Sequence, residues 1–180
     1  GFSISSIAQE LNRKVKQLLP TERFVAAVLV SIDLGQRAMR IWNGGAPSTL
    51  FVSTEGQILR QWRPSHPPLG ILDNEEFDAK TEVFYWHEAG QLILCSDGVA
   101  EAENEVCEHF GSERIVQALS RAGFDRQFEC LKTAVKDFLG GRTGLDDISL
   151  IGVHCPMDFA GETVTQEHGD KDFNYHLSPG

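Results

Sequence analysis

The fold is decided by residues 91–104, which read Gln-Leu-Ile-Leu-Cys-Ser-Asp-Gly-Val-Ala-Glu-Ala-Glu-Asn. A short apolar run, residues 92–95, stops abruptly at the Ser-Asp-Gly sequence of residues 96–98. This pattern predicts a buried strand that delivers one carboxylate, Asp97, at its end. Gly98 has no side chain, so we expect the backbone to turn sharply beside that carboxylate.

A second acidic position lies at Asp146 and Asp147, which open another apolar run at residues 148–151. Asp97 and this pair each flank a predicted strand, so each should hold a fixed position. If they converge, two charges about 4 Å apart repel each other by about 4 kcal/mol at an effective dielectric of about 20. Such a cluster is stable when it is protonated or holds a cation, and oxygen ligands suit Mg²⁺ or Mn²⁺. The alternative is that Asp97 caps a turn and one of the pair caps the final strand.

The composition is that of one globular domain, and it argues against some classes of function. The 180 residues are 41% apolar and 23% charged, with a net charge of −10. No basic stripe is visible, so electrostatic binding of nucleic acid is not expected. No apolar run approaches the roughly 18 residues of a membrane span, and no signal peptide opens the chain, so we expect no membrane contact and a cytoplasmic location. The four separated cysteines include no Cys-x-x-Cys pair, which predicts reduced thiols and no zinc site.

The remaining hydrophobic patterns predict an α+β fold, with antiparallel strands and with helices gathered at the start and after the sixth strand. We expect the strand at 24–32 to be covered on both faces, and the short loops between residues 33 and 56 to join a meander. Ser6 with Gln9 fits a capping box at the first helix, and Ser3 is the alternative cap. The predicted helices are 3–19, 112–121 and 125–139, and the predicted strands are 24–32, 38–43, 49–53, 57–62, 77–83, 92–95 and 147–154.

The chain divides into a predicted domain, residues 1–155, and a polar tail or linker, residues 156–180. In the tail only Phe173, Tyr175 and Leu177 alternate in the manner of a small strand. The chain starts without Met, so we expect it to be a processed or excised part of a longer protein.

Other residues could carry chemistry, but each has a plainer interpretation. His66 and His87 could be general acids, although isolated histidines are more often structural. Ser96 lies beside Asp97, yet no Gly-x-Ser-x-Gly sequence frames it as a nucleophile. The Asn-Gly-Gly sequence at 43–45 could bring its backbone close to a phosphate, or it could be an ordinary turn. The acidic residues of the stretch 101–108 are most simply those of a solvated loop.

Together, the motifs and their order resemble the SpoIIE-like branch of the metal-dependent serine/threonine protein phosphatases, the PPM or type 2C family. Each motif is weak singly, and the resemblance rests on their order and spacing from about residue 3 to 153. The matching stretches are Phe24-Val25, residues 43–47, Pro68-Leu69-Gly70, residues 96–102, Phe110-Gly111 and residues 146–150.

The resemblance implies a sandwich of two antiparallel β-sheets flanked by helices (αββα), in which this chain lacks the family's first strands. It implies hydrolysis of phosphoserine or phosphothreonine by water activated on two Mn²⁺ or Mg²⁺ ions. Carried over, Asp97 and Asp146 resemble two metal ligands, and Gly98 and Asp147 would support the site. It also implies a phosphorylated anti-anti-sigma factor of the STAS fold as substrate. Further implied partners are a receiver or sensor domain in the same full-length chain and a second copy in a homodimer.

The sequence also departs from the family pattern. Relatives begin with strands whose Gly-Asp motifs supply the remaining metal ligands, and these motifs are not in residues 1–180. Ala46 stands at the usual His position, and Ala100 at the usual Thr position. We therefore expect the 180-residue chain alone to be inactive. Two functions remain for the whole protein: a phosphatase domain of a bacterial response regulator, or an inactive pseudophosphatase adaptor that binds a sigma-factor regulator.

Overall fold

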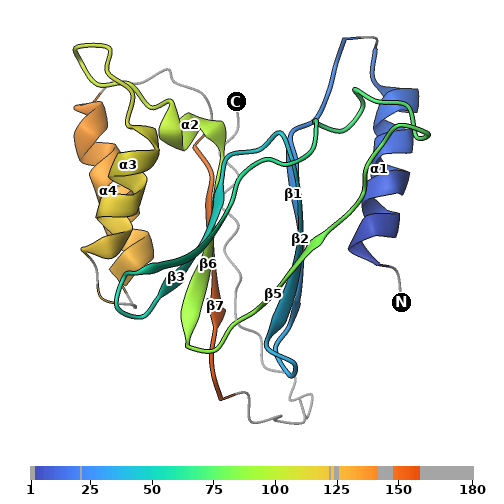
Figure 1. The fold of residues 1–180 in the computed structure, drawn as a ribbon. Coiled ribbons are helices and arrows are strands. Elements are labelled where there is room, and N and C mark those ends of the chain that lie inside the picture. Colours follow the sequence, from blue (N-terminus) through green and yellow to red (C-terminus); the bar gives the residue numbers. More distant parts are fainter. Residues whose placement is uncertain (1–2, 21, 122, 124–125, 142–147, 159–180) are drawn as a thin grey trace, which may run out of the picture.

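The computed structural model describes residues 3–20, 22–121, 123, 126–141 and 148–158. Two antiparallel sheets face each other, and helices cover their outer faces, which gives the predicted four-layer α+β sandwich (Figure 1). One sheet has the strand order β1-β2-β5, and the other has the order β4-β3-β6-β7. The strands are β1 (Ala27–Asp33), β2 (Ala38–Gly44), β3 (Thr49–Ser53), β4 (Ile58–Trp62), β5 (Glu82–Tyr85), β6 (Gly90–Cys95) and β7 (Leu150–Cys155). The helices are α1 (Ile4–Leu18), α2 (Asp97–Ala100), α3 (Gly111–Ser120) and α4 (Gln127–Leu139).

Helix α1 packs on the β1-β2-β5 sheet because one of its faces is apolar. Its buried Ile4 and Ala8 join Trp42 of β2 in a cluster between helix and sheet. The N-terminal cap is Ser3, whose Oγ accepts a hydrogen bond of 3.1 Å from the backbone N–H of Ser6. The capping box predicted at Ser6 and Gln9 is therefore wrong, and the alternative cap is confirmed. Leu18, which the pattern places on the apolar face, is 77% exposed.

Asn12 is a fully buried polar residue on the inner face of α1, and the hydrophobic pattern did not single it out. Its Nδ2 donates to the carbonyl of Leu72 at 3.1 Å and to Oδ1 of Asn74 at 2.8 Å. Its Oδ1 accepts from the backbone N–H of Gly70 at 2.8 Å. A buried amide needs such partners, since an unsatisfied polar group is costly. Asn12 therefore ties α1 to the loop that follows the proline-rich segment.

A cluster of large side chains holds the two sheets together. Phe84 of β5 packs edge-on against Phe51 and Trp62 of the opposite sheet, each with ring centroids 5.4 Å apart. Such aromatic pairs add about 0.5–1.5 kcal/mol beyond the burial of their surface. The buried members of the cluster are Met39, Ile41, Phe51, Trp62, Trp86, Leu92 and Cys155. The outer face of the β4-β3-β6-β7 sheet forms a second core with α2, α3 and α4.

The strands pair differently from the predicted meander. The strands β3 and β4 form the expected hairpin, with Gly56 at φ +82° in its turn. The strands β1 and β2 also pair. However, β2 and β3 belong to opposite sheets, so the meander prediction is wrong at this connection. The turn after β2 carries the chain across the sandwich and contains Gly45 at φ +75°.

Several predicted boundaries are also wrong. The first strand begins at Ala27, and Phe24 lies outside it with 58% of its surface exposed. The alternation at 77–83 does not mark a strand over that range, because β5 spans Glu82–Tyr85. Phe77 and Ala79 are instead buried against α1 from an irregular segment, which produces the same alternation. The final strand begins at Leu150, three residues later than predicted.

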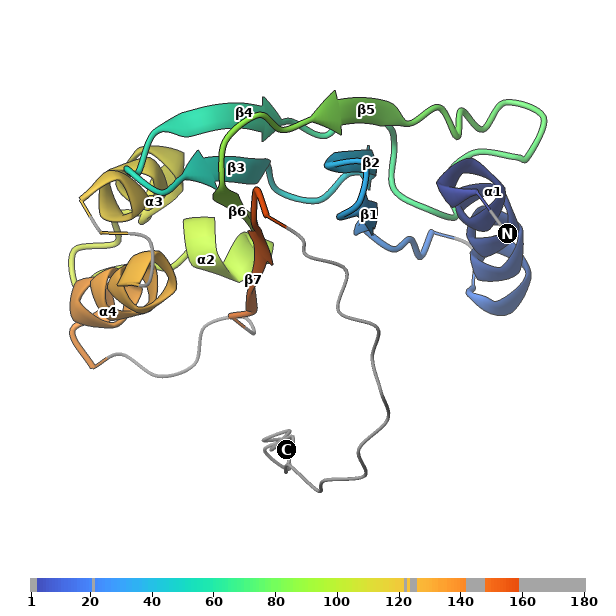
Figure 2. The ribbon, with the colours of Figure 1, turned by 90° about the horizontal axis from the view of Figure 1, so that it is seen from below.

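The strands β1 and β7 are edge strands on the same side of the sandwich (Figure 2). Within the described residues, β1 pairs only with β2, and β7 pairs only with β6. Their position explains why β1 is half-buried along most of its length rather than covered on both faces. None of the helices in the described part of the chain is long and apolar enough to cross a membrane.

Candidate active site

Asp97 is placed at the end of β6, as the sequence predicts. Ser96 is the N-cap residue of the short helix α2, with extended backbone angles of φ −72° and ψ 165°. Asp97 is the first residue of that helix, and its Oδ1 accepts a hydrogen bond of 3.0 Å from the backbone N–H of Gly98. The predicted sharp turn is therefore the start of one helical turn. Gly98 is buried within it and does not have the left-handed conformation typical of glycine in a turn.

Ser149, which precedes β7, is bound directly to Ser96. The backbone N–H of Ser96 donates to the carbonyl of Ser149 at 2.9 Å, and the N–H of Ser149 donates to Oγ of Ser96 at 2.9 Å. These two bonds extend the pairing of β6 and β7 by one step beyond Cys95 and Leu150. They hold the approach to β7 beside the residue that precedes Asp97. Sequence reasoning did not assign this role to either serine.

The two predicted acidic positions have different outcomes. The end of β6 and the start of β7 do lie together, as the convergence argument requires. Asp146 and Asp147 themselves lie outside the described residues. Their approach to Asp97 therefore stays a prediction.

A cleft of about 290 Å³ opens at Asp97, whose side chain is exposed. Its walls come from β1 and the residue before it, from the turn after β2, from the end of β6 and from the start of β7. The cleft therefore lies between the two sheets, at the start of the edge strands β1 and β7. The lining residues are Ala26, Ala27, Val28, Ala46, Pro47, Leu94, Cys95, Ser96, Asp97, Ser149 and Ile151.

The donor set of the cleft supplies one good ligand for a hard cation. Asp97 is the only carboxylate among its described lining residues. In the described ranges, no group of three or more His, Cys, Asp or Glu side chains is placed to hold a metal ion. Carboxylate oxygen suits Mg²⁺ or Mn²⁺, but six oxygen ligands are typical of such ions. Asp97 therefore fits the role of a ligand, while the described residues alone do not complete a site for one ion or two.

Cys95 also lines the cleft, but it does not have the character of a nucleophile. Burial raises the pKa of its thiol above the ordinary value. The reactive form of cysteine is the thiolate, which a raised pKa disfavours at neutral pH. Among the described lining residues, the side chains left for chemistry in the cleft are the serine hydroxyls and the Asp97 carboxylate.

Neither predicted histidine lines this cleft. His66 stacks on Trp42 with ring centroids 5.4 Å apart and planes at 11°. Its side chain is only 10% exposed, and its Nδ1 lies 3.8 Å from a carboxylate oxygen of Asp78. This environment favours the structural interpretation of His66. His87 is exposed on the turn between β5 and β6.

The Asn-Gly-Gly sequence forms a turn that shapes the cleft wall. Asn43 is 2% exposed; its Oδ1 accepts from the N–H of Ala46 at 3.1 Å, and its Nδ2 donates to the carbonyl of Pro47 at 3.2 Å. A Cβ on Gly45 would collide with the ring of Pro68. Asn43 therefore fixes the turn that brings Ala46 and Pro47 into the cleft. Ala46, where the family pattern has His, is thus a wall residue.

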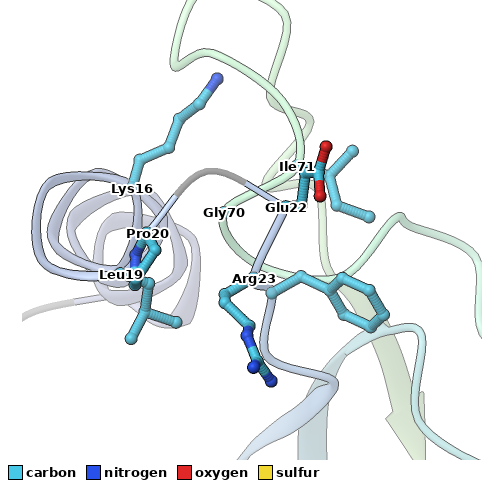
Figure 3. A pocket seen from close by; sticks show the side chains of 8 residues that line it. Lys16, Leu19, Pro20, Glu22, Arg23, Gly70 and Ile71 are labelled. Carbon is cyan, nitrogen blue, oxygen red and sulfur yellow. The ribbon is translucent and has the colours of Figure 1, made fainter.

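A second hollow, of about 360 Å³, lies at the C-terminal end of α1 (Figure 3). The cationic side chains among its described lining residues are Lys16 and Arg23, and Lys16 pairs with Asp73. One carboxylate, Glu22, belongs to it. None of its described lining residues belongs to the cleft at Asp97, and a site with more cations than carboxylates does not suit a metal ion. The other lining residues are Leu19, Pro20, Phe24, Gly70 and Ile71.

Comparison with known proteins identifies the family. The family described as "Stage II sporulation protein E (SpoIIE)" matches residues 1–156. The chain belongs to the SpoIIE family. A curated relative of this SpoIIE-family chain is Protein IcfG of Synechocystis sp. (strain ATCC 27184 / PCC 6803 / Kazusa), which is 25% identical over 127 residues. That match covers 68% of this chain and 19% of IcfG, so the chain spans about a fifth of that relative's length.

Solved structures show the same fold. The SiaA-PP2C domain of Pseudomonas aeruginosa has a TM-score of 0.67 at 20% identity, over 83% of this chain and 60% of that one. The PP2C phosphatase domain of the cell fate determinant SpoIIE from Bacillus subtilis, solved with a fragment of its regulatory domain, also has a TM-score of 0.67 at 20% identity. This match covers 86% of the present chain and 44% of the chain in the SpoIIE structure. The family resemblance seen in the sequence is thereby confirmed, and the fold is that of PP2C-type phosphatase domains.

Proposed function

We propose that residues 1–155 are the larger part of a protein serine/threonine phosphatase domain that hydrolyses phosphoserine. One observation carries this proposal: the hydrogen-bonded pair of Ser96 and Ser149 joins the ends of β6 and β7 beside an exposed Asp97 in a cleft. The family membership gives the reaction class. The Asp97 carboxylate, which lines the cleft between the two sheets, supports this cleft as the place where the reaction would occur.

In this proposal, Asp97 and Asp146 are ligands of Mn²⁺ or Mg²⁺, and Asp147 supports the site. When bound, two such ions would activate water and neutralise charge on a phosphate ester. The chain's own residues position that chemistry. The N–H of Gly98 orients the Asp97 carboxylate, and the Ser96–Ser149 pair brings the segment that follows Asp146 in the sequence to the same strand end. The apolar cleft walls would limit the access of bulk water to the phosphate.

The proposed setting is a cytoplasmic bacterial response regulator. Its substrate would be a phosphorylated anti-anti-sigma factor of the STAS type, and its own chain would carry a receiver or sensor domain. A regulatory domain accompanies the phosphatase domain in the Bacillus SpoIIE protein, which supports this arrangement. Homodimerisation of the full-length protein belongs to the same proposal. The 180-residue chain alone would be inactive, because the two proposed ligands Asp97 and Asp146 are too few to hold two ions.

The test is phosphate release from a phosphoserine-carrying STAS protein by the full-length protein, with and without Mn²⁺. We expect Mn²⁺-dependent release that Asp97→Asn lowers by about 100-fold or more, because metal stabilisation of the transition state is worth several kcal/mol. Asp137→Asn is the matched control, since Asp137 is exposed on α4 and lies outside the cleft. Substrate binding without metal-dependent turnover would contradict the proposal and point to an adaptor.

A further inference from the structure

We infer that an apolar groove between α4 and the start of β7 binds a small amphipathic molecule with a hydrocarbon body and one anionic group, such as a medium-chain carboxylate. The groove has a volume of about 400 Å³, which lies within the range of small-molecule sites in proteins. The proposed phosphatase reaction makes no use of it. Its lining residues are Val99, Phe128, Leu131, Lys132, Val135, Lys136, Leu139, Ile148 and Leu150.

The walls of the groove suit a hydrocarbon body. Its floor includes Leu131, Val135 and Val99, which have exposed fractions of 0%, 5% and 1%. Ile148 stands at the rim with 42% of its surface exposed. Among the described lining residues, all side chains except two are apolar, and apolar surface left open to water is commonly a site of binding. A ligand that covers this surface gains the free energy of its burial.

The two polar side chains among the described lining residues set the charge of the ligand. They are Lys132 and Lys136, one helical turn apart on α4 and both exposed. Lys132 lies 3.7 Å from Glu129, which is outside the lining. Lys136 has no ion pair within 4.0 Å among the described residues. In a chain of net charge −10, two lysines beside an apolar groove, of which Lys136 has no described carboxylate within 4.0 Å, favour a ligand with an anionic group.

Two elements, α2 and β7, contribute residues both to the groove and to the cleft. Val99 follows Asp97 by two residues on α2, and Leu150 follows Ser149 by one residue. The two sites share none of their described lining residues. Binding in the groove can therefore be measured without phosphatase activity, and its failure would not bear on the proposed reaction.

The test uses the full 180-residue chain and three probes with the same hydrocarbon chain: decanoate, decanol and decyltrimethylammonium. Calorimetric titration should give saturable binding of one decanoate, with weaker binding of decanol and weakest binding of the cation. In NMR spectra, decanoate should shift the methyl signals of Leu131, Val135 and Leu150, while Val28 and Ile41 stay unchanged. Non-saturable uptake, or equal binding of the anion and the cation, would overturn the inference.

Two variants locate the anion. Lys136→Gln should weaken decanoate binding by about two- to fivefold, as expected for one exposed ion pair, and should leave decanol binding unchanged. Lys14→Gln on the exposed face of α1 removes the same charge far from the groove residues and should change neither. Ile148→Glu places a carboxylate at the rim and should weaken decanoate more than Lys136→Gln does. Equal effects of Lys136→Gln and Lys14→Gln would mean that only net charge matters, which contradicts the assignment.

Discussion

Replacing Ser96 by Ala tests whether the serine pair holds the candidate site together. The change removes the Oγ that accepts from the N–H of Ser149 at 2.9 Å and keeps the backbone bond in the opposite direction. A typical hydrogen bond contributes about 0.5–1.5 kcal/mol to stability, and Ser149 is exposed, so water can replace the lost partner. We therefore expect a loss of about 1 kcal/mol in the free energy of unfolding, roughly a fivefold change in the unfolding constant.

The measurement is urea unfolding together with amide hydrogen exchange. In Ser96→Ala, the amide of Ser149 should exchange faster, while amides in the centre of the β6–β7 ladder, such as that of Leu92, should keep their protection. Ser112→Ala on the exposed first turn of α3 is the matched control and should change stability by no more than about 0.5 kcal/mol. Unchanged stability and unchanged exchange at Ser149 would refute the reasoning.

Three further predictions concern the rest of the structure. Burial raises the pKa of the Cys155 thiol from its ordinary value of 9.0 to about 11, so the native state keeps a proton that the unfolded state loses. Stability should therefore be unaffected below about pH 8.5 and fall by roughly 2 kcal/mol as the pH rises to 11; urea unfolding of Cys155→Ala should lack this component. Asn12→Ala removes the three hydrogen bonds of a fully buried amide and should cost about 2–4 kcal/mol, with a matching drop in thermal midpoint; a loss below 1 kcal/mol would contradict its tethering role. Gly45→Ala forces a side chain into φ +75° and against Pro68, so calorimetry should show a loss of at least about 1 kcal/mol, whereas Gly123→Ala, with open space at its Cβ, should show little change.

Local patterns predicted the elements whose signals are local. The hairpin of β3 and β4, the helix α1 and the position of Asp97 at the end of β6 follow from periodicity, turn residues and an abrupt stop in an apolar run. The alternation around Phe77 was misleading, since burial against a helix leaves the same signature as a strand. Periodicity reports which side chains are buried, not what buries them.

The features that were not predicted depend on contacts between distant residues. Asn12 can be buried because hydrogen-bond partners about 60 positions away satisfy its amide. Ser96 likewise binds Ser149 across 53 positions. The separation of β2 and β3 into opposite sheets likewise follows from their pairing with β5 and β6. The short helix α2 depends on packing, because four residues are too few to show a helical period.

Mn²⁺ binding to the full-length protein most directly tests the central claim, that Asp97 and Asp146 meet at one metal centre. Calorimetric titration of the wild type, Asp97→Asn, Asp146→Asn and the double variant separates the contributions of the two carboxylates. We predict that each single change weakens Mn²⁺ binding by about tenfold or more and that the double variant loses less than the sum, as coupled ligands of one site do. Additive losses, or affinities equal to that of the control Asp137→Asn, would contradict the claim.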